Sequence, residues 1–349
     1  TSLPEVPGGS ANWDYRFSWP RDASLGISAF LGVGLGDEAR AFLSWLTIAS
    51  RLTRPRLHVL YDLEGRPSSR ERERRDVPGY RGSLPVRLGN AAADQHQLDV
   101  YGWVVGAVWE LHARGERLPP DVWRAVAAWA DFVSGSWREP DSGIWEERGE
   151  PHHYVHSKLM AWIALDRALR LSEGYRVGRS RRDRWSKERE ALGAEIRSRG
   201  VDADRGVYVR HDETSELDAA LLTLPDVGIE GETSPRVVRT IEAVAAELGA
   251  GDGLLYRYPR SREDGEGAFL ACSFWLARAL SRIGQVDRAG ELFESLCSRA
   301  SELGLFGEEL DPGTGRHLGN FPQALTHSAL VSAALAIQEA TRGRAGSRG

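Results

Sequence analysis

The sequence predicts an all-α protein built as a closed ring of helical hairpins. Much of the 349-residue chain falls into segments in which apolar side chains recur every three or four positions, as on one face of a helix. Short joints such as Gly34–Gly36 alternate with long loops such as Arg54–Gly89. Alternating joints of this kind gather the long loops at one end of the ring, where functional residues are commonly carried.

The first half of the chain is expected to hold five helices. The periodicity is plainest where Leu98, Tyr101, Val105 and Val108 fall at spacings of three and four. Leu57–Leu63 alternates instead, which favours a short strand or hairpin within a loop. The five helices are expected over Ser24–Leu35, Asp37–Ser50, Leu98–His112, Asp121–Ser134 and His156–Leu171.

Six more helices are expected in the second half. Ser234 and Pro235 supply a capping hydroxyl and a proline at the first helical position, and Gly284 ends a later helix. The mixed charges of Arg176–Glu190 are typical of a solvated helix face. The polar segment 341–349 is expected to be a disordered tail, which leaves residues 1–340 as one domain. The helices are expected over Arg182–Arg199, Ser215–Leu224, Pro235–Leu248, Gly267–Ile283, Val286–Leu303 and Pro322–Glu339.

Composition excludes several classes of partner. A formal charge of -5 gives no electrostatic reason to bind nucleic acid. No run of 18 apolar residues is present, so we expect no membrane-spanning helix and no membrane association. Cys272 and Cys297 lie in apolar helical patterns and are interpreted as buried thiols. Reduced cysteines and the lack of a visible signal peptide favour a cytoplasmic protein.

Two acidic pairs lie beside large apolar residues. Glu146 and Glu147 follow Ile144-Trp145, and Glu308 and Glu309 open the segment Glu-Glu-Leu-Asp. A carboxylate next to a tryptophan is costly to desolvate, so it is usually paired, hydrogen-bonded or protonated. Cleavage of a glycosidic bond needs one carboxyl to protonate the leaving oxygen and another to activate water. Solvated Glu-Glu pairs are common, so the two pairs alone do not establish this chemistry.

A metal site was also considered. His152 and His156 have the spacing of two ligands on one helix, and His153 lies beside them. These residues straddle a loop and the start of a helix, and the sequence shows no third ligand. We therefore expect no metal and no other cofactor.

Several blocks together resemble the catalytic domain of glycoside hydrolase family 15, the glucoamylase and bacterial trehalase family. They keep their order and approximate spacing over nearly the whole chain. The family's fold is an (α/α)6 barrel, which agrees with the ring of hairpins. The blocks are Asn12–Asp22, Gly79–Ser83, Gly89–Gln95, Gly143–Glu146, His156–Lys158, Tyr256–Tyr258, Gly267–Leu270, Glu308–Pro312 and Gly319–Ala324.

The resemblance implies an inverting glycosidase. Glu146 matches the family's general acid and Glu308 its general base. Inversion requires the two carboxyl groups to lie roughly 6.5–9.5 Å apart, which leaves room for a water molecule. We expect Glu146 to have a raised pKa and Glu308 to be ionised.

The resemblance also implies residues that bind the substrate. Arg21 and Asp22 match a pair that grips glucose hydroxyls, although an ion pair at a helix start, with Asp22 as the cap, is the structural alternative. Trp19 and Trp145 are expected to stack on sugar faces or to wall the pocket.

Four more residues match the family's pattern around the reacting groups. Tyr15 matches a tyrosine that helps to hold the nucleophilic water. Arg257 matches a further substrate contact. Glu147 and Glu309 match polar neighbours of the acid and the base.

The implied activity is exo-hydrolysis of α-glucosides, with β-glucose released from non-reducing ends. Trehalose hydrolysis by the same family and a non-catalytic carbohydrate-binding role remain as alternatives. A terpene cyclase would need an Asp-rich magnesium motif, which the sequence lacks. Bacterial relatives usually carry an N-terminal β-sandwich domain and a first barrel helix ahead of the segment at Thr1. We therefore expect the barrel to lack its first helix, and the β-sandwich domain to pack on it in a longer protein.

Overall fold

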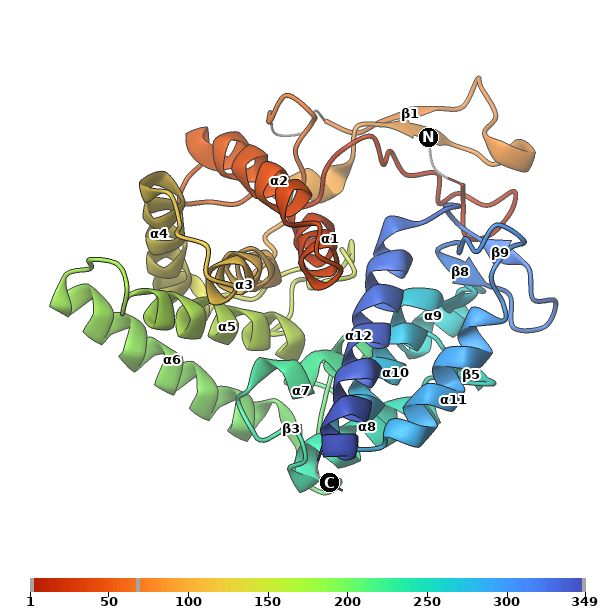
Figure 1. Ribbon diagram of the computed structural model, residues 1–349. Helices are drawn as coiled ribbons and strands as arrows, with labels where there is room; N and C mark the ends of the chain where they lie inside the picture. The colour runs from red at the N-terminus through yellow and green to blue at the C-terminus, as the bar shows by residue number, and fades with distance from the viewer. Residues whose placement is uncertain (1–2, 67–69, 347–349) are drawn as a thin grey trace.

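The computed structural model describes residues 3–66 and 70–346, and its helices form two concentric rings (Figure 1). Each inner helix packs on the next, and α12 closes the inner ring by packing on α1. The inner helices are α1 (Pro20–Gly32), α3 (Asp99–Ala113), α5 (Val155–Leu171), α7 (Leu224–Val227) with the preceding 3₁₀ helix Ala219–Thr223, α10 (Leu270–Arg282) and α12 (Ala324–Gly346). The predicted all-α barrel of hairpins is thereby confirmed.

The outer ring holds the partner helices of the hairpins. They are α2 (Gly36–Ala49), α4 (Pro120–Ser136), α6 (Arg179–Arg199), α8 (Pro235–Glu247) and α11 (Val286–Cys297). The predicted capping signals are confirmed. The Ser234 side chain accepts a hydrogen bond from the backbone N–H of Val237, and Gly284 follows the end of α10 with φ +88.

Short strands lie in the loops and do not form a large sheet. Three two-stranded pairs join β1 (Arg72–Arg74) to β2 (Val86–Leu88), β3 (Val201–Asp202) to β4 (Val207–Tyr208), and β5 (Gly249–Gly251) to β6 (Leu254–Leu255). An antiparallel sheet of β7 (Ala268–Phe269), β8 (Glu309–Leu310) and β9 (His317–Leu318) fixes the segment around Glu308. The short helix α9 (Pro259–Glu263) lies in the loop before β7.

The core between the rings depends on close helix packing. Gly102 of α3 faces the backbone of Met160 in α5, and a Cβ there would lie 2.2 Å from the Met160 carbonyl oxygen. Glycine therefore lets these two inner helices approach more closely than any other residue would. Trp129, Trp137 and Trp185 are fully buried in the same core.

Two predicted elements differ in the structure. Leu57–Leu63 is not a strand, because Val59, Leu60 and Tyr61 are buried consecutively and only Tyr61 makes a bridge, to Ser18. The segment expected as one helix over Ser215–Leu224 is a 3₁₀ helix followed by α7. The Asp218 carboxylate starts the 3₁₀ turn by accepting from the Ala220 N–H.

Two helix ends also differ. α11 stops at Cys297, short of Leu303, whose side chain is exposed and has no core to pack against. α12 continues to Gly346, into the segment predicted to be a tail, while residues 347–349 lie outside the described part. Arg344 anchors the extension by donating to the Asp287 carboxylate and the Gly284 carbonyl.

An apolar groove lies on the outer side of the contact between α1 and α12. In the part of the chain that is described, five helices occupy the outer ring and none covers this sixth position. Phe30, Val33 and Leu35 are exposed here, and Val331 of α12 lines the other side. Within residues 3–66 and 70–346, the barrel thus lacks one outer helix, as the sequence predicts.

Other expectations from composition can be compared with the structure. Cys272 is buried and Cys297 is half-buried, and neither forms a disulfide. Among residues 3–66 and 70–346, no helix has the length and apolar character needed to cross a membrane.

Candidate active site

A cavity of about 780 Å³ collects most of the residues that the sequence singles out. Its walls come from the start of α1, the loop after α4, the loop before α9, and the segments on either side of the β8–β9 hairpin. The predicted residues that line it are Tyr15, Trp19, Arg21, Asp22, Trp145, Glu146, Arg257 and Glu308. The cavity continues into the apolar groove between α1 and α12.

The Glu146 carboxylate is held by two donors from the start of α1. Trp19 Nε1 donates to Glu146 Oε1 at 2.7 Å, and Arg21 Nη1 lies 3.3 Å from the same oxygen. Glu146 itself has φ +60, in the left-handed region that is costly for a residue with a side chain. Gln95 Nε2 fixes this conformation by donating to the backbone carbonyls of Glu146 and Glu147. The strained backbone directs the carboxylate into the cavity.

The Glu308 carboxylate is held by Asn320, which follows β9 and lies across the β8–β9 hairpin from Glu308. The backbone N–H and the Nδ2 of Asn320 donate to Glu308 Oε2 at 3.1 and 3.0 Å. Gly319 lies directly against this carboxyl, with φ +68. A Cβ at Gly319 would lie 2.8 Å from both Cβ and Oε2 of Glu308. Glycine is therefore required for the Glu308 carboxyl to keep its position.

Burial raises the pKa of both carboxyls. For Glu146 burial is the largest cause, Arg21 and Trp19 oppose it, and the negative charge of Asp22 adds to it. For Glu308 burial is again the largest cause, and the Asn320 donors and Arg257 oppose it. The pKa of Glu146 is raised, as expected. The pKa of Glu308, which was expected to be ionised, is raised as well. The direction of the pKa shift does not distinguish an acid from a base.

Arg21 and Asp22, which the resemblance assigns to sugar binding, form a compact polar corner. Arg21 Nε donates to Asp22 Oδ2 at 3.0 Å, and Arg21 Nη1 donates to the Ile144 carbonyl at 2.7 Å. The ion pair of the structural alternative is present, but Asp22 does not cap a helix, because α1 begins at Pro20 and Asp22 lies inside its first turn. Trp19 walls the cavity and also donates to Glu146, a role that the sequence does not reveal.

Aromatic rings and a second arginine form the opposite wall. Trp145 Nε1 donates to both oxygens of Asp218, at 2.9 and 3.0 Å, which fixes the indole. The Arg257 guanidinium lies 5.5 Å from the Trp145 ring centroid and pairs with Glu266. Tyr15 packs against Trp19, with ring centroids 5.5 Å apart.

Glu147 and Glu309 do not line the cavity. Glu147 Oε1 accepts from the Tyr154 hydroxyl at 3.1 Å and also from Arg210. Glu309 is fully buried, and its Oε2 accepts from the Gly267 N–H at 2.8 Å. Both carboxylates hold the loops that carry their neighbours.

Sequence reasoning did not single out Asn320 and Gln95, which contact the two central carboxyl residues. Both lie in blocks that carry the family resemblance, Gly319–Ala324 and Gly89–Gln95. Their position in those blocks was the only feature of the sequence that indicated a place in the site. An amide side chain has no distinctive chemistry until its partner is known.

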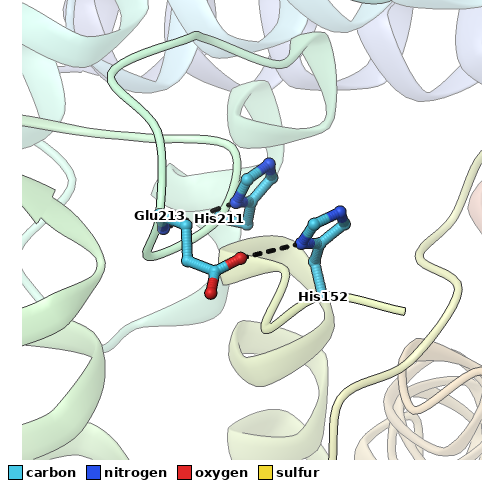
Figure 2. A group of neighbouring side chains, drawn as sticks. All are labelled: His152, His211 and Glu213. Carbon is cyan, nitrogen blue, oxygen red and sulfur yellow. Dashed lines mark hydrogen bonds and ion pairs between the residues drawn. The ribbon is translucent and has the colours of Figure 1, made fainter. Parts of the chain in front are cut away.

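The three histidines considered as ligands separate in the structure. His156 is buried in α5 with its ring beside Trp103, and burial lowers its pKa to about 3. His152 instead lies next to His211 and Glu213, as Figure 2 shows.

Comparison with known proteins identifies the family. The sequence profile described as Glycosyl hydrolases family 15 matches residues 1–335. The chain belongs to this family. It is 42% identical over 346 residues to a trehalase of Mycolicibacterium smegmatis, covering 97% of this chain and 51% of that protein. A trehalase of Mycobacterium tuberculosis is also 42% identical, over 97% of this chain and 50% of that protein. The chain thus spans about half the length of these curated relatives.

Solved structures share the fold at low sequence identity. A glycosidase in complex with glucose superposes with a TM-score of 0.76 at 18% identity, covering 95% of this chain and 92% of that chain. A bacterial glucoamylase complexed with acarbose gives a TM-score of 0.74 at 15% identity, covering 93% of this chain and 49% of that chain. These likenesses support the (α/α)6 architecture.

Replacing Gly319 tests how tightly Glu308 is positioned. Gly319→Ala places a methyl group against the Glu308 carboxyl, so we expect the rate of glycoside hydrolysis to fall at least about tenfold. Gly315→Ala is the matched control. Gly315 has φ +71 and open space around its Cβ position, so that variant pays only the backbone cost of about 1–2 kcal/mol. Steady-state rates and thermal unfolding of both variants make the comparison. Equal activity in the two variants would contradict the close contact.

Proposed function

We propose that this chain hydrolyses an α-glucoside with inversion, with Glu146 as general acid and Glu308 as general base. The observation that carries the proposal is that Glu308, which is buried, and Glu146, which is half-buried, line one cavity, each held by donors from a different part of the chain. Family membership gives the class of reaction.

The donors around each carboxyl suit the proposed roles. Arg21 lies beside Glu146 and can stabilise the carboxylate that forms once Glu146 has given its proton to the leaving oxygen. Asn320 places two N–H donors on one oxygen of Glu308, which favours the ionised form that a base requires. The other Glu308 oxygen is then the one that accepts a proton from water.

Trehalose is the substrate that we propose. The curated relatives with 42% identity are trehalases, whereas the glucoamylases are similar at 15% identity or below in the structures compared. This favours the trehalose alternative over the general exo-hydrolysis of α-glucosides that the sequence first suggested.

Arg21 and Asp22 are proposed to grip hydroxyls of the glucose unit that is released. Asp22 is partly exposed to the cavity while Arg21 is nearly buried, so the carboxylate is the group that a sugar reaches first. Tyr15, Trp19, Trp145 and Arg257 are proposed to form the rest of the binding wall. Glu147 accepts from Arg210 and Glu309 accepts from the Gly267 N–H, and through these hydrogen bonds they are proposed to position the loops that carry Glu146 and Glu308.

Glucose release from a panel of sugars tests this function. Trehalose, maltose, maltotriose and isomaltose are offered to the unaltered chain, to Glu146→Gln and to Glu308→Gln, with folding checked by circular dichroism. We expect trehalose to be turned over fastest and each substitution to reduce the rate at least about 100-fold, because each removes a proton-transfer group. Proton NMR of the first product should show β-glucose. No turnover of any sugar by the well-folded chain would favour the carbohydrate-binding alternative, and α-glucose as first product would contradict inversion.

We further propose that the apolar groove between α1 and α12 is covered, in a longer protein, by N-terminal chain that includes a helix and a β-sandwich domain. Phe30, Val33 and Leu35 together expose a patch that suits an amphipathic helix. The curated relatives are about twice as long as this chain, which leaves room for such a region. A longer chain should therefore bind less hydrophobic dye than residues 1–349, and Val33→Ser should lower dye binding only in the short chain. Equal dye binding by both chains would overturn this proposal.

A further inference from the structure

We propose that His152, His211 and Glu213 form a site for one transition-metal ion of the Zn²⁺ class. One ligand atom of each residue lies within 4.8 Å of the others. The three side chains converge from two different segments of the chain, as Figure 2 shows. None of them lines the cavity described above.

The donor set selects the kind of ion. Two imidazoles and one carboxylate suit Zn²⁺, Ni²⁺ or Cu²⁺, whereas Mg²⁺ and Ca²⁺ prefer oxygen ligands throughout. Three protein ligands leave a fourth position for water. The glycosidase chemistry proposed above needs no metal, so this ion has no part in breaking the glycosidic bond.

The geometry is close to what coordination requires. His152 Nδ1 and Glu213 Oε2 are already 3.0 Å apart. In a tetrahedral site with bonds of about 2.0–2.1 Å, neighbouring ligand atoms lie roughly 3.3 Å apart. The most widely separated pair therefore has to close by at most about an ångström and a half. Glu213 is 68% exposed at its side chain, so its carboxylate has the freedom to follow the ion.

One adjustment is needed in the histidines. Their rings are stacked, with centroids 4.2 Å apart and planes 13° from parallel. A metal binds in the plane of an imidazole. The two rings therefore have to rotate about their Cβ–Cγ bonds until one nitrogen lone pair of each ring points to the same ion. Both histidines are only partly buried, which leaves room for this rotation.

The site links the two segments that support Glu146. His152 pairs through its backbone with Asp141 in the loop that carries Glu146, residues 141–154, which we call the acid loop. His211 and Glu213 follow Arg210, which contacts Glu147 of the acid loop and lies 3.7 Å from Asp218. The ion would thus join the acid loop to the segment 209–218. Binding of the ion at this site does not depend on the function proposed above.

Calorimetric titration of the tag-free chain with ZnCl2 tests the site without any substrate. We expect one equivalent to bind, and His152→Gln or His211→Gln to weaken binding at least about tenfold, because each removes a ligand and loss of even a group that only supports a ligand costs that much. His153→Gln is the matched control, because this histidine is adjacent in sequence and lies outside the cluster. The His153 variant should bind like the unaltered chain. Binding that survives His211→Gln, or no binding at millimolar Zn²⁺, would overturn the proposal.

Two further readouts distinguish coordination from general association. Co²⁺ bound in place of Zn²⁺ should give visible absorption typical of four-coordinate nitrogen and oxygen ligands, which is lost in His211→Gln. Saturating Zn²⁺ should also raise the melting temperature by on the order of a few degrees, because the ion binds the folded state only. The same rise in Glu213→Gln and His211→Gln would show that the ion binds elsewhere. Neither readout depends on sugar hydrolysis, so their failure and the failure of the proposed function are distinguishable.

Discussion

The packing of α12 on α1 is the contact on which the site depends, because it closes the inner ring. Glu146 follows α4 in the first half of the chain, and Glu308 precedes β8 near its end. The closed ring brings these two segments, which are distant in sequence, to one cavity. The helices supply a rigid frame, and the loops that they carry supply the chemistry.

The two carboxyl groups are kept in place at a cost in backbone conformation and burial. Glu146 has a left-handed backbone, which Gln95 holds through two carbonyls. Glu308 is nearly inaccessible to solvent, and the position of its carboxyl depends on the absence of a side chain at Gly319. Strain and buried charge of this kind are retained where a site has to be organised before its substrate arrives. The surrounding aromatic residues and paired arginines offset part of this cost.

The sequence predicted the frame better than the loops. Amphipathic periodicity is a local property, so every long helix was located to within a few residues, apart from the ends of α11 and α12. Leu57–Leu63 was misjudged because its burial comes from partners elsewhere in the chain, which alternation does not describe. The Ser215–Leu224 segment was misjudged because the Asp218 side chain competes for backbone N–H groups.

The same division applies to the candidate site. Resemblance to the family located eight of the residues that line the cavity, and physical chemistry explained why carboxyls beside tryptophan are informative. The hydrogen bonds from Trp19, Gln95 and Asn320 could not be predicted, because each joins segments that only the folded chain brings together. The proximity of His152 to His211 could not be predicted for the same reason.

The pH dependence of activity in two substituted chains tests the assignment of acid and base most directly. Trp19→Phe removes a donor that stabilises ionised Glu146, so the pKa of Glu146 rises and the acid stays protonated to higher pH. Asn320→Ala removes a donor from Glu308, so the pKa of Glu308 rises and the base is lost at a higher pH as the solution is acidified. The account predicts that Trp19→Phe moves the alkaline limb, and Asn320→Ala the acidic limb, each upward by about one pH unit. Movement of the acidic limb by Trp19→Phe, or of neither limb by either change, would contradict the assigned roles.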